Sequence, residues 1–337
     1  MLAPSTSDRK QHNDLHKQVR PHLDALNEFL AEETSKFEPE IREQAEYCLS
    51  HRGKQLRPAL LFFSGWSDRA NQHFEDLVQA AATVELVHQA TLVHDDILDG
   101  AQLRHNHPTL KEKHDPRIAV LLGDALFAHA LKLASDFSDV YVCRVVSQAT
   151  RRVCTGEISQ SLEIQGKAHA LDDYYRIIDL KTAELFRVSG ELGARLANYS
   201  AEFVSAAAEF GRRVGMAYQI YDDLVDITGE EHKIGKTLGT DLANGKMTLP
   251  THMLLQRMKA EGQNYLVEQI LKEPLDVELC AAYLDQYDIP LAVQSAFHEQ
   301  LDLAMASLEP YVDLPPYAPL AQMVLYVREY ASSLAKM

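Results

Sequence analysis

The spacing of apolar residues along the chain is helical almost throughout. In one representative segment, apolar side chains recur three and four positions apart, at Ile118, Leu121, Leu122, Ala125 and Leu126. This is the period of one face of an α-helix. The alternation with a period of two that is typical of strands is hard to find. The pattern therefore predicts an all-α protein.

Helix starts and chain breaks can be placed at several points. Asp115 before Pro116 has the form of an N-cap followed by a proline in the first turn, and Asp172 is expected to cap the helix that contains Tyr174. Further breaks fall at Pro108, residues 198–200, Pro274 and residues 315–316. None is long enough to be an interdomain linker. Residues 1–337 are therefore expected to form a single domain, with residues 1–13 as a flexible N-terminal tail.

The composition excludes several classes of protein. The formal net charge of -16 argues against a nucleic-acid-binding surface and against a polybasic membrane anchor. Hydrophobic residues make up 46% of the 337 positions, which is ample for a large core. The chain does not begin with a basic segment followed by an apolar run, and no uninterrupted apolar stretch reaches spanning length. We expect a cytoplasmic protein with no transmembrane segment and no nucleic-acid partner.

The cysteines fit the same expectation. Cys48, Cys143, Cys154 and Cys280 are scattered along the chain and lack the spacing of a metal site. Because cytoplasmic thiols are kept reduced, we expect buried free cysteines and no disulfides.

Two acidic clusters of similar sequence are the most informative feature of the chain. They are DDILD at 95–99 and DDLVD at 222–226, and each follows an apolar run with helical spacing. The first and last Asp of each cluster share a helix face, where like charges repel. Carboxylate oxygens suit Mg²⁺, whose octahedral shell is often completed by phosphate. The clusters therefore predict a magnesium and phosphate site, with these candidate metal-binding residues: Asp95, Asp96, Asp99, Asp222, Asp223 and Asp226.

Further motifs accompany the clusters in a fixed order. They are GKQLRP at 53–58, His88, the first cluster with Arg104, Lys181-Thr182, Gln219 with the second cluster, Gly235-Lys236, and DLANGKMTLP at 241–250. In this order and at these separations they resemble the motifs of trans-isoprenyl diphosphate synthases. The resemblance extends from about Phe29 to the last helix. It is specific, because an ordered set of this size is not expected by chance.

The resemblance implies a fold and an activity. The fold would be a single large antiparallel helical bundle around a deep central cavity, with the acidic clusters facing each other at its open end. The activity would be a prenyl transfer that depends on two or three Mg²⁺ ions, carried out by a homodimer. Isopentenyl diphosphate would be joined head to tail to an allylic diphosphate. The allylic carbon–oxygen bond ionises first, so positive charge is needed at the departing diphosphate.

The resemblance also assigns the allylic site. Asp95 and Asp99 would bind metal from one helix and Asp222 from the facing helix, with the other three aspartates supporting them. Thr182 and Gln219 would lie beside the carbocation and the attacking alkene. Lys181 would act both in catalysis and in binding the diphosphate. The cations expected on the allylic diphosphate are Arg104, Lys181, Lys236 and Lys246.

Isopentenyl diphosphate would occupy a separate anion pocket without metal. Lys54, Arg57 and His88 match the family's residues for this pocket. At the fourth position His105 stands where the family has the second Arg of an Arg-Arg pair. An unperturbed imidazole is mostly neutral at neutral pH, although a nearby diphosphate would favour its charged form. We therefore expect weaker binding of isopentenyl diphosphate, but not its loss.

Product length is expected to depend on residues just before the first cluster, where the helix faces the growing tail. Ala90, Thr91 and Val87 are small or of moderate size, and no aromatic residue stands at the two nearest positions. This resembles the synthases that make longer polyprenyl chains. We therefore expect a product of geranylgeranyl length or longer.

Two other functions are compatible with parts of the sequence. A terpene cyclase on the same fold would keep the metal clusters but not the isopentenyl pocket, and His105 favours it whereas Lys54, Arg57 and His88 do not. A noncatalytic subunit of a heteromeric synthase would be expected to lose its metal clusters, and both are whole here. Outside the clusters, Gly156-Glu157 suggests a supporting contact between helices and Arg151-Arg152 an ordinary surface patch.

Overall fold

The computed structural model describes residues 6–50, 53–66, 73–104, 106–163, 170–229, 239, 241, 245–272 and 277–334. These residues are almost entirely helical, which confirms the all-α prediction. Among them, the two-residue strands β1 (Leu103–Arg104) and β2 (His107–Pro108) form one short antiparallel pair. The helices are α1 (Thr6–Ser35), α2 (Pro39–Ser50), α3 (Leu56–Ser64), α4 (Phe74–Leu98), α5 (Leu110–Lys113), α6 (Pro116–Ser135), α7 (Tyr141–Glu163), α8 (Leu171–Ile178), α9 (Glu184–Leu196), α10 (Ala201–Thr228), α13 (Leu249–Ala260), α14 (Asn264–Lys272), α15 (Val277–Gln286), α16 (Ile289–Leu308) and α17 (Tyr317–Leu334).

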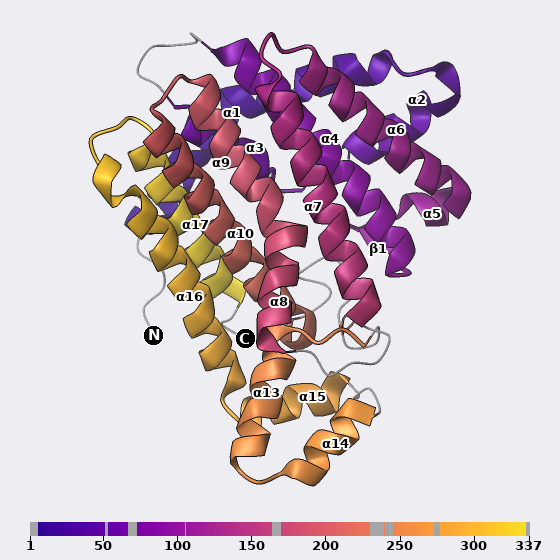
Figure 1. Cartoon of the computed structure of the whole chain (residues 1–337), viewed down its shortest axis with the longest axis vertical. Helices are drawn as coiled ribbons and strands as arrows, with labels where there is room; N and C mark the ends of the chain where they lie inside the picture. Colours follow the sequence, from indigo (N-terminus) through magenta and orange to yellow (C-terminus); the bar gives the residue numbers. More distant parts are fainter. Residues whose placement is uncertain are drawn as a thin grey trace.

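Long helices lie side by side in a bundle, and the shorter α13, α14 and α15 cluster at its lower end in Figure 1. α10 packs along α9 and α16, and α4 packs along α6. α4 is buried on nearly all sides, as expected for a helix whose apolar residues are not confined to one face. α9 contacts both α4 and α10. The two helices that carry the acidic clusters are thereby held in one core.

The helix starts test the local predictions. Asp115 caps α6, because its side chain accepts a hydrogen bond from the backbone N–H of Arg117. The prediction for Asp172 was wrong, since α8 begins at Leu171 and the carboxylate of Asp173 accepts from the N–H of Ala170. Asp172 still lies in the first turn, where a negative charge favours the helix dipole.

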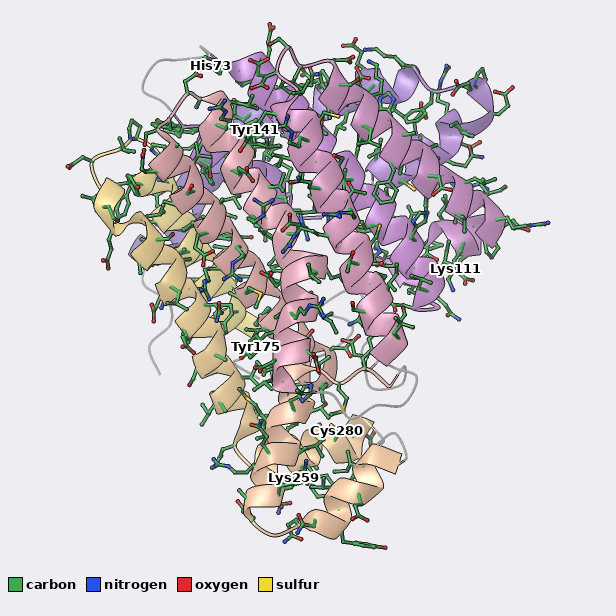
Figure 2. All side chains as sticks on the ribbon, viewed as in Figure 1. His73, Lys111, Tyr141, Tyr175, Lys259 and Cys280 are labelled. Atoms are coloured by element: carbon green, nitrogen blue, oxygen red, sulfur yellow. The ribbon has the colours of Figure 1, made fainter. Side chains whose placement is uncertain are left out.

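The structure bears on the predicted N-terminal tail and confirms the predictions for the cysteines in part. α1 begins at Thr6, inside the segment expected to be a tail, and the flexibility of residues 1–13 stays a prediction. All four cysteines are free, as predicted. Cys280, labelled in Figure 2, is fully buried, whereas Cys154 is exposed, so the expectation of burial was wrong for that residue.

One helix bears on the expectation of no transmembrane segment. Among the described residues, α6 is long and apolar enough to cross a membrane by length and composition. In the structure it packs against α4 as part of the bundle. Its outer face carries the exposed apolar side chains of Ile118, Val120 and Leu121.

Candidate active site

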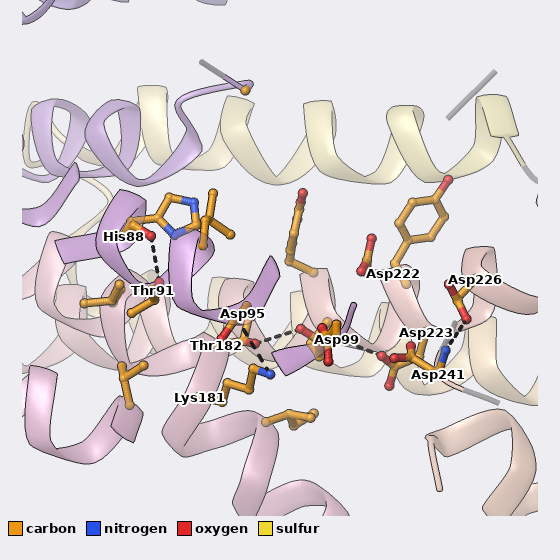
Figure 3. A pocket seen from close by; sticks show the side chains of 18 of the residues that line it. His88, Thr91, Asp95, Asp99, Lys181, Thr182, Asp222, Asp223, Asp226 and Asp241 are labelled. Carbon is orange, nitrogen blue, oxygen red and sulfur yellow. Dashed lines mark hydrogen bonds and ion pairs between the residues drawn. The ribbon is translucent and has the colours of Figure 1, made fainter. Parts of the chain in front are cut away.

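A cavity of about 470 Å³ opens between α3, α4, α8, α9, α10 and α17. Both acidic clusters lie at the carboxyl ends of their helices, α4 and α10, and both contribute to the cavity wall, as Figure 3 shows. Negative side chains are disfavoured at this end of a helix, because the helix dipole is negative there. The arrangement therefore needs compensating positive charge.

The first cluster divides its three aspartates between two roles. Asp95 and Asp99 line the cavity. Asp96 is buried and turned toward Arg104, whose Nε and Nη2 donate to its Oδ1 at 2.9 and 2.6 Å. Burial raises the pKa of Asp95 to about 6, although the nearby Lys181 acts in the opposite direction. Asp96 thus holds Arg104 beside the cluster, where Arg104 also lines the cavity.

The second cluster is anchored by a chain of hydrogen bonds. Tyr174 Oη donates to Asp223 Oδ2 at 2.7 Å, and Gln219 Nε2 donates to Asp223 Oδ1 at 2.6 Å. Thr182 Oγ1 in turn donates to Gln219 Oε1 at 2.7 Å. Burial raises the pKa of Asp223 well above its usual range. Because Asp223 has both oxygens engaged, it orients Gln219 and Thr182, while Asp222 and Asp226 also reach the cavity.

Lys181 and Thr182 lie in a π-helical turn, η1 (Asp179–Ala183), between α8 and α9. Such turns are rare and often mark functional sites. Lys181 Nζ donates to Gln160 Oε1 at 2.9 Å, forms an ion pair with Glu157 and lies 3.9 Å from Asp95 Oδ2. Its pKa is raised, because Asp95 and Glu157 outweigh the effect of burial. Lys181 therefore stays charged beside the first cluster.

A second lysine joins the first cluster to the segment after α10. Lys246 Nζ lies 2.8 Å from Asp99 Oδ1 and 3.3 Å from Asp241 Oδ1, and Asp241 N–H donates to Asp226 at 3.1 Å. Burial lowers the pKa of Lys246, but Asp241 and Asp99 raise it by more. The lysine thus supplies positive charge between the acidic walls. Lys236, the remaining allylic candidate, lies outside the described residues.

The isopentenyl candidates Lys54, Arg57 and His88 also line the cavity. Arg57 Nη1 lies 3.0 Å from His88 Nε2, and its guanidinium stacks 4.5 Å from the Phe186 ring centroid. Burial lowers the pKa of Arg57. Lys54 Nζ lies 3.4 Å from the centroid of the Tyr330 ring on α17. Cations that face a cavity suit an anionic ligand. His105 lies outside the described residues.

The candidates for product length differ in their orientation. Thr91, four residues before Asp95, lines the cavity, whereas Ala90 and Val87 are buried and absent from its wall. Five residues place Ala90 about 140° around the helix from Asp95. The helical period therefore turns Thr91, and not Ala90, to the same side as the metal cluster. The effect of all three residues on product length stays a prediction.

The donor set fits a metal that is shared with a substrate. Among the described residues, no three acidic, His or Cys side chains are close enough to hold a metal ion by themselves. Mg²⁺ commonly takes only one or two carboxylates and fills its shell with water and substrate phosphates. A diphosphate between the two walls would complete such a shell. The hard oxygen donors Asp95, Asp99 and Asp222 all line the cavity.

Several residues of the cavity wall were missed by the sequence analysis. Asp241 opens the DLANGK motif, so its position gave a signal. Tyr174, Gln160 and Tyr330 gave none, because they come from helices that only the tertiary structure brings to the cavity.

An all-helical bundle with two acidic clusters and several cations around one cavity defines the isoprenyl synthase fold. A family model described as polyprenyl synthetase matches residues 38–287, and the chain belongs to that family. It is accordingly a prenyltransferase, as its relatives are prenyl diphosphate synthases.

Individual relatives support this assignment. Heptaprenyl diphosphate synthase component 2 of Bacillus subtilis (strain 168) is 35% identical over 245 residues, covering 73% of this chain and 70% of its own length. Solanesyl diphosphate synthase 1 of Arabidopsis thaliana is 30% identical over 272 residues, covering 80% of this chain and 64% of its own.

Solved structures agree with the fold over nearly the whole chain. A polyprenyl synthase from Caulobacter crescentus CB15, complexed with calcium and isoprenyl diphosphate, has a TM-score of 0.85 and 26% identity, covering 94% of this chain and 97% of its own. A decaprenyl diphosphate synthase from Rhodobacter capsulatus has a TM-score of 0.84 and 29% identity, covering 95% and 99%.

Proposed function

We propose that this chain is a Mg²⁺-dependent trans-prenyltransferase that condenses isopentenyl diphosphate with an allylic diphosphate. The observation that carries the proposal is the joint lining of one cavity by both acidic clusters and by the cations Lys54 and Arg57. A terpene cyclase would need only the first of these features. The calcium and isoprenyl diphosphate bound to the Caulobacter crescentus protein are consistent with such a site.

Each side of the cavity has a distinct task in the proposed reaction. Two or three Mg²⁺ ions, when bound by Asp95, Asp99 and Asp222, would neutralise the departing diphosphate. Arg104, Lys181, Lys246 and Lys236 would add further positive charge there.

The remaining residues act on the carbocation and the second substrate. Thr182 Oγ1 donates a hydrogen bond to Gln219 Oε1, so the lone pairs of the threonine oxygen can face the allylic cation. Lys54, Arg57, His88 and His105 would hold the isopentenyl diphosphate, whose alkene attacks the cation. This attack leaves a positive charge on the isopentenyl unit, and the released diphosphate would accept the proton lost from the carbon beside that charge, which forms the new double bond.

The product is proposed to be of geranylgeranyl length or longer. Thr91 places a small side chain on the cavity wall directly before the first cluster, so it does not close the path of a growing tail. Relatives named heptaprenyl, octaprenyl, solanesyl and decaprenyl diphosphate synthases are consistent with this range.

A homodimer is proposed on the basis of one exposed apolar face. α6 and α7 lie side by side in the bundle (Figure 1) and expose Val120, Leu121, Ile158 and Leu162. Contiguous exposed apolar residues commonly mark an interface between subunits. The Bacillus subtilis relative is named a component, so a chain of different sequence is the alternative partner. We propose that the protein acts in the cytoplasm and that α6 does not span a membrane.

Product analysis tests the proposal. Purified protein is incubated with Mg²⁺, radiolabelled isopentenyl diphosphate and geranyl, farnesyl or geranylgeranyl diphosphate in turn, and the dephosphorylated products are sized. Radiolabelled chains at least as long as geranylgeraniol are expected, and no product should form in EDTA. Consumption of the allylic substrate without incorporation of isopentenyl diphosphate would instead identify a cyclase. Activity only after addition of a second chain would identify a heteromeric enzyme.

A further inference from the structure

The π-helical turn η1 changes which residues of its helix face the cavity. Tyr174, Ile178, Thr182 and Phe186 all line the cavity wall, although they are spaced four residues apart. In a regular α-helix each step of four rotates the side chain by about 40°, so residues separated by three steps would diverge by about 120°. The π turn takes up an extra residue and keeps the later side chains on the cavity side. The direction of Thr182 therefore depends on this turn.

Carboxylates bracket the turn, and one arginine contacts both. Asp179 is the first residue of η1, and Glu184 follows its last residue. Arg152, on α7, places Nη2 3.4 Å from Asp179 Oδ2 and Nε 2.9 Å from Glu184 Oε2. Glu184 is only 1% exposed, so its charge requires partners. Arg187 donates to both of its oxygens, and Arg152 connects it to α7. The planar guanidinium can span two carboxylates in a way that a lysine ammonium cannot.

α10 holds the turn from the other side. Arg212 Nη1 lies 2.8 Å from Asp179 Oδ1. Backbone contacts accompany the ion pairs on both helices. A Cβ added to Gly156 on α7 would lie 2.7 Å from the backbone N of Lys181, and one added to Gly215 on α10 would lie 2.6 Å from Ala183 Cα. The turn is therefore fixed between two helices by charge and by close packing.

We propose that Arg152 is a positioning residue for prenyl transfer. Arg152 ties both ends of the π turn to α7 and so keeps Lys181 and Thr182 directed at the cavity. Arg152 itself does not line the cavity. The kinetic part of this inference rests on the proposed function. The pair Arg151-Arg152 is therefore more than a surface patch, because Arg152 fixes the turn that carries Lys181 and Thr182.

Kinetics of three variants test the inference. Arg152→Gln removes both ion pairs, Arg152→Lys keeps the charge but not the fork, and Arg151→Gln changes the exposed neighbour as a matched control. We expect Arg152→Gln to lower kcat roughly ten- to a hundredfold, since small misplacements of reacting groups have such effects. The Michaelis constant for isopentenyl diphosphate should stay within about twofold, because its proposed pocket is untouched, whereas that for the allylic diphosphate should rise, because Lys181 also serves that diphosphate. Arg152→Lys should restore part of kcat, and Arg151→Gln should behave as wild type.

Hydrogen exchange gives a readout that does not depend on activity. In Arg152→Gln the amides of residues 179–184 should exchange faster, while those of the α4 and α10 cores stay protected. Unchanged kcat and unchanged exchange would overturn the proposal. So would faster exchange over the whole molecule with a matching fall in Tm, which indicates a purely structural role. If the wild type transfers no prenyl group, the proposed function fails, and the exchange comparison still decides whether Arg152 fixes the turn.

Discussion

Six aspartates of the same chemistry have three different environments in this site. Asp96 is held by Arg104, and Asp223 is buried as the acceptor for Tyr174 and Gln219. Those that line the cavity without either arrangement are Asp95, Asp99, Asp222 and Asp226. The environment of each carboxylate, and not its place in the DDxxD pattern alone, thus separates candidate metal ligands from orienting groups.

Removing a cavity-facing carboxylate should abolish turnover. Asp95→Ala or Asp222→Ala leaves diphosphate charge without metal in the transition state, an effect of several kcal/mol, so kcat should fall by about a hundredfold or more. The fold should be retained, because both side chains are partly exposed in the cavity. Glu75→Ala, an exposed acid on α4, serves as the control. Steady-state rates at saturating Mg²⁺ near the wild-type value would refute the metal assignment.

Because residue 105 is a histidine, we expect the Michaelis constant for isopentenyl diphosphate to depend on pH. If its imidazolium binds isopentenyl diphosphate, the Michaelis constant for that substrate should rise as pH increases through the His titration range, since the neutral ring loses the charge. His105→Arg should lower this constant by about tenfold, because a charge-assisted contact contributes roughly 1.5–3 kcal/mol.

The control for this prediction is the allylic substrate. Its Michaelis constant should change little with pH or with the substitution, because other cations and metal hold its diphosphate. An isopentenyl constant that is the same in wild type and His105→Arg at every pH would place His105 outside the pocket.

At the scale of an element, the face of α4 determines which residue can limit the growing tail. Thr91→Phe places a ring on the cavity wall, so products should become shorter. Ala90→Phe inserts the same ring into a packed core and should destabilise the fold by about 1–3 kcal/mol.

Product sizing and thermal unfolding distinguish the two substitutions. Shorter products from Thr91→Phe with a wild-type Tm would support the cavity as the tail-binding site. Shorter products from a stable Ala90→Phe protein would show that the tail instead runs along the side of α4 that faces the core.

At the scale of the whole molecule, the outer face of α6 and α7 is the main candidate interface. Leu121 is 67% exposed on this face, and Leu291 on α16 is similarly exposed, at 64%. Leu121→Glu places a charge in the proposed interface and should convert the dimer to a monomer, because an unpaired buried charge is costly. Leu291→Glu is the matched control and should stay dimeric. Sedimentation or light scattering that gives one mass for both variants and the wild type would exclude this face.

The sequence by itself determined the helical class, because the period of apolar residues is a local property. It also identified the two acidic clusters and the ordered motifs, since each is a short run of residues that can be recognised without knowing its neighbours. Lys54, Arg57, His88 and Thr182 were named in this way, and all four line the cavity.

Only the tertiary structure decided how these residues act together. The turn that directs Lys181 and Thr182 is held by Arg152 and Arg212, which lie far from it in the sequence, and Tyr174 on α8 reaches Asp223 because the turn η1 that follows α8 packs against α10. The same holds for Ala90 and Thr91, whose different exposure follows from the rotation of α4 against its neighbours. Motifs identify chemical groups locally, but their orientation and burial arise from packing between helices, which no local pattern encodes.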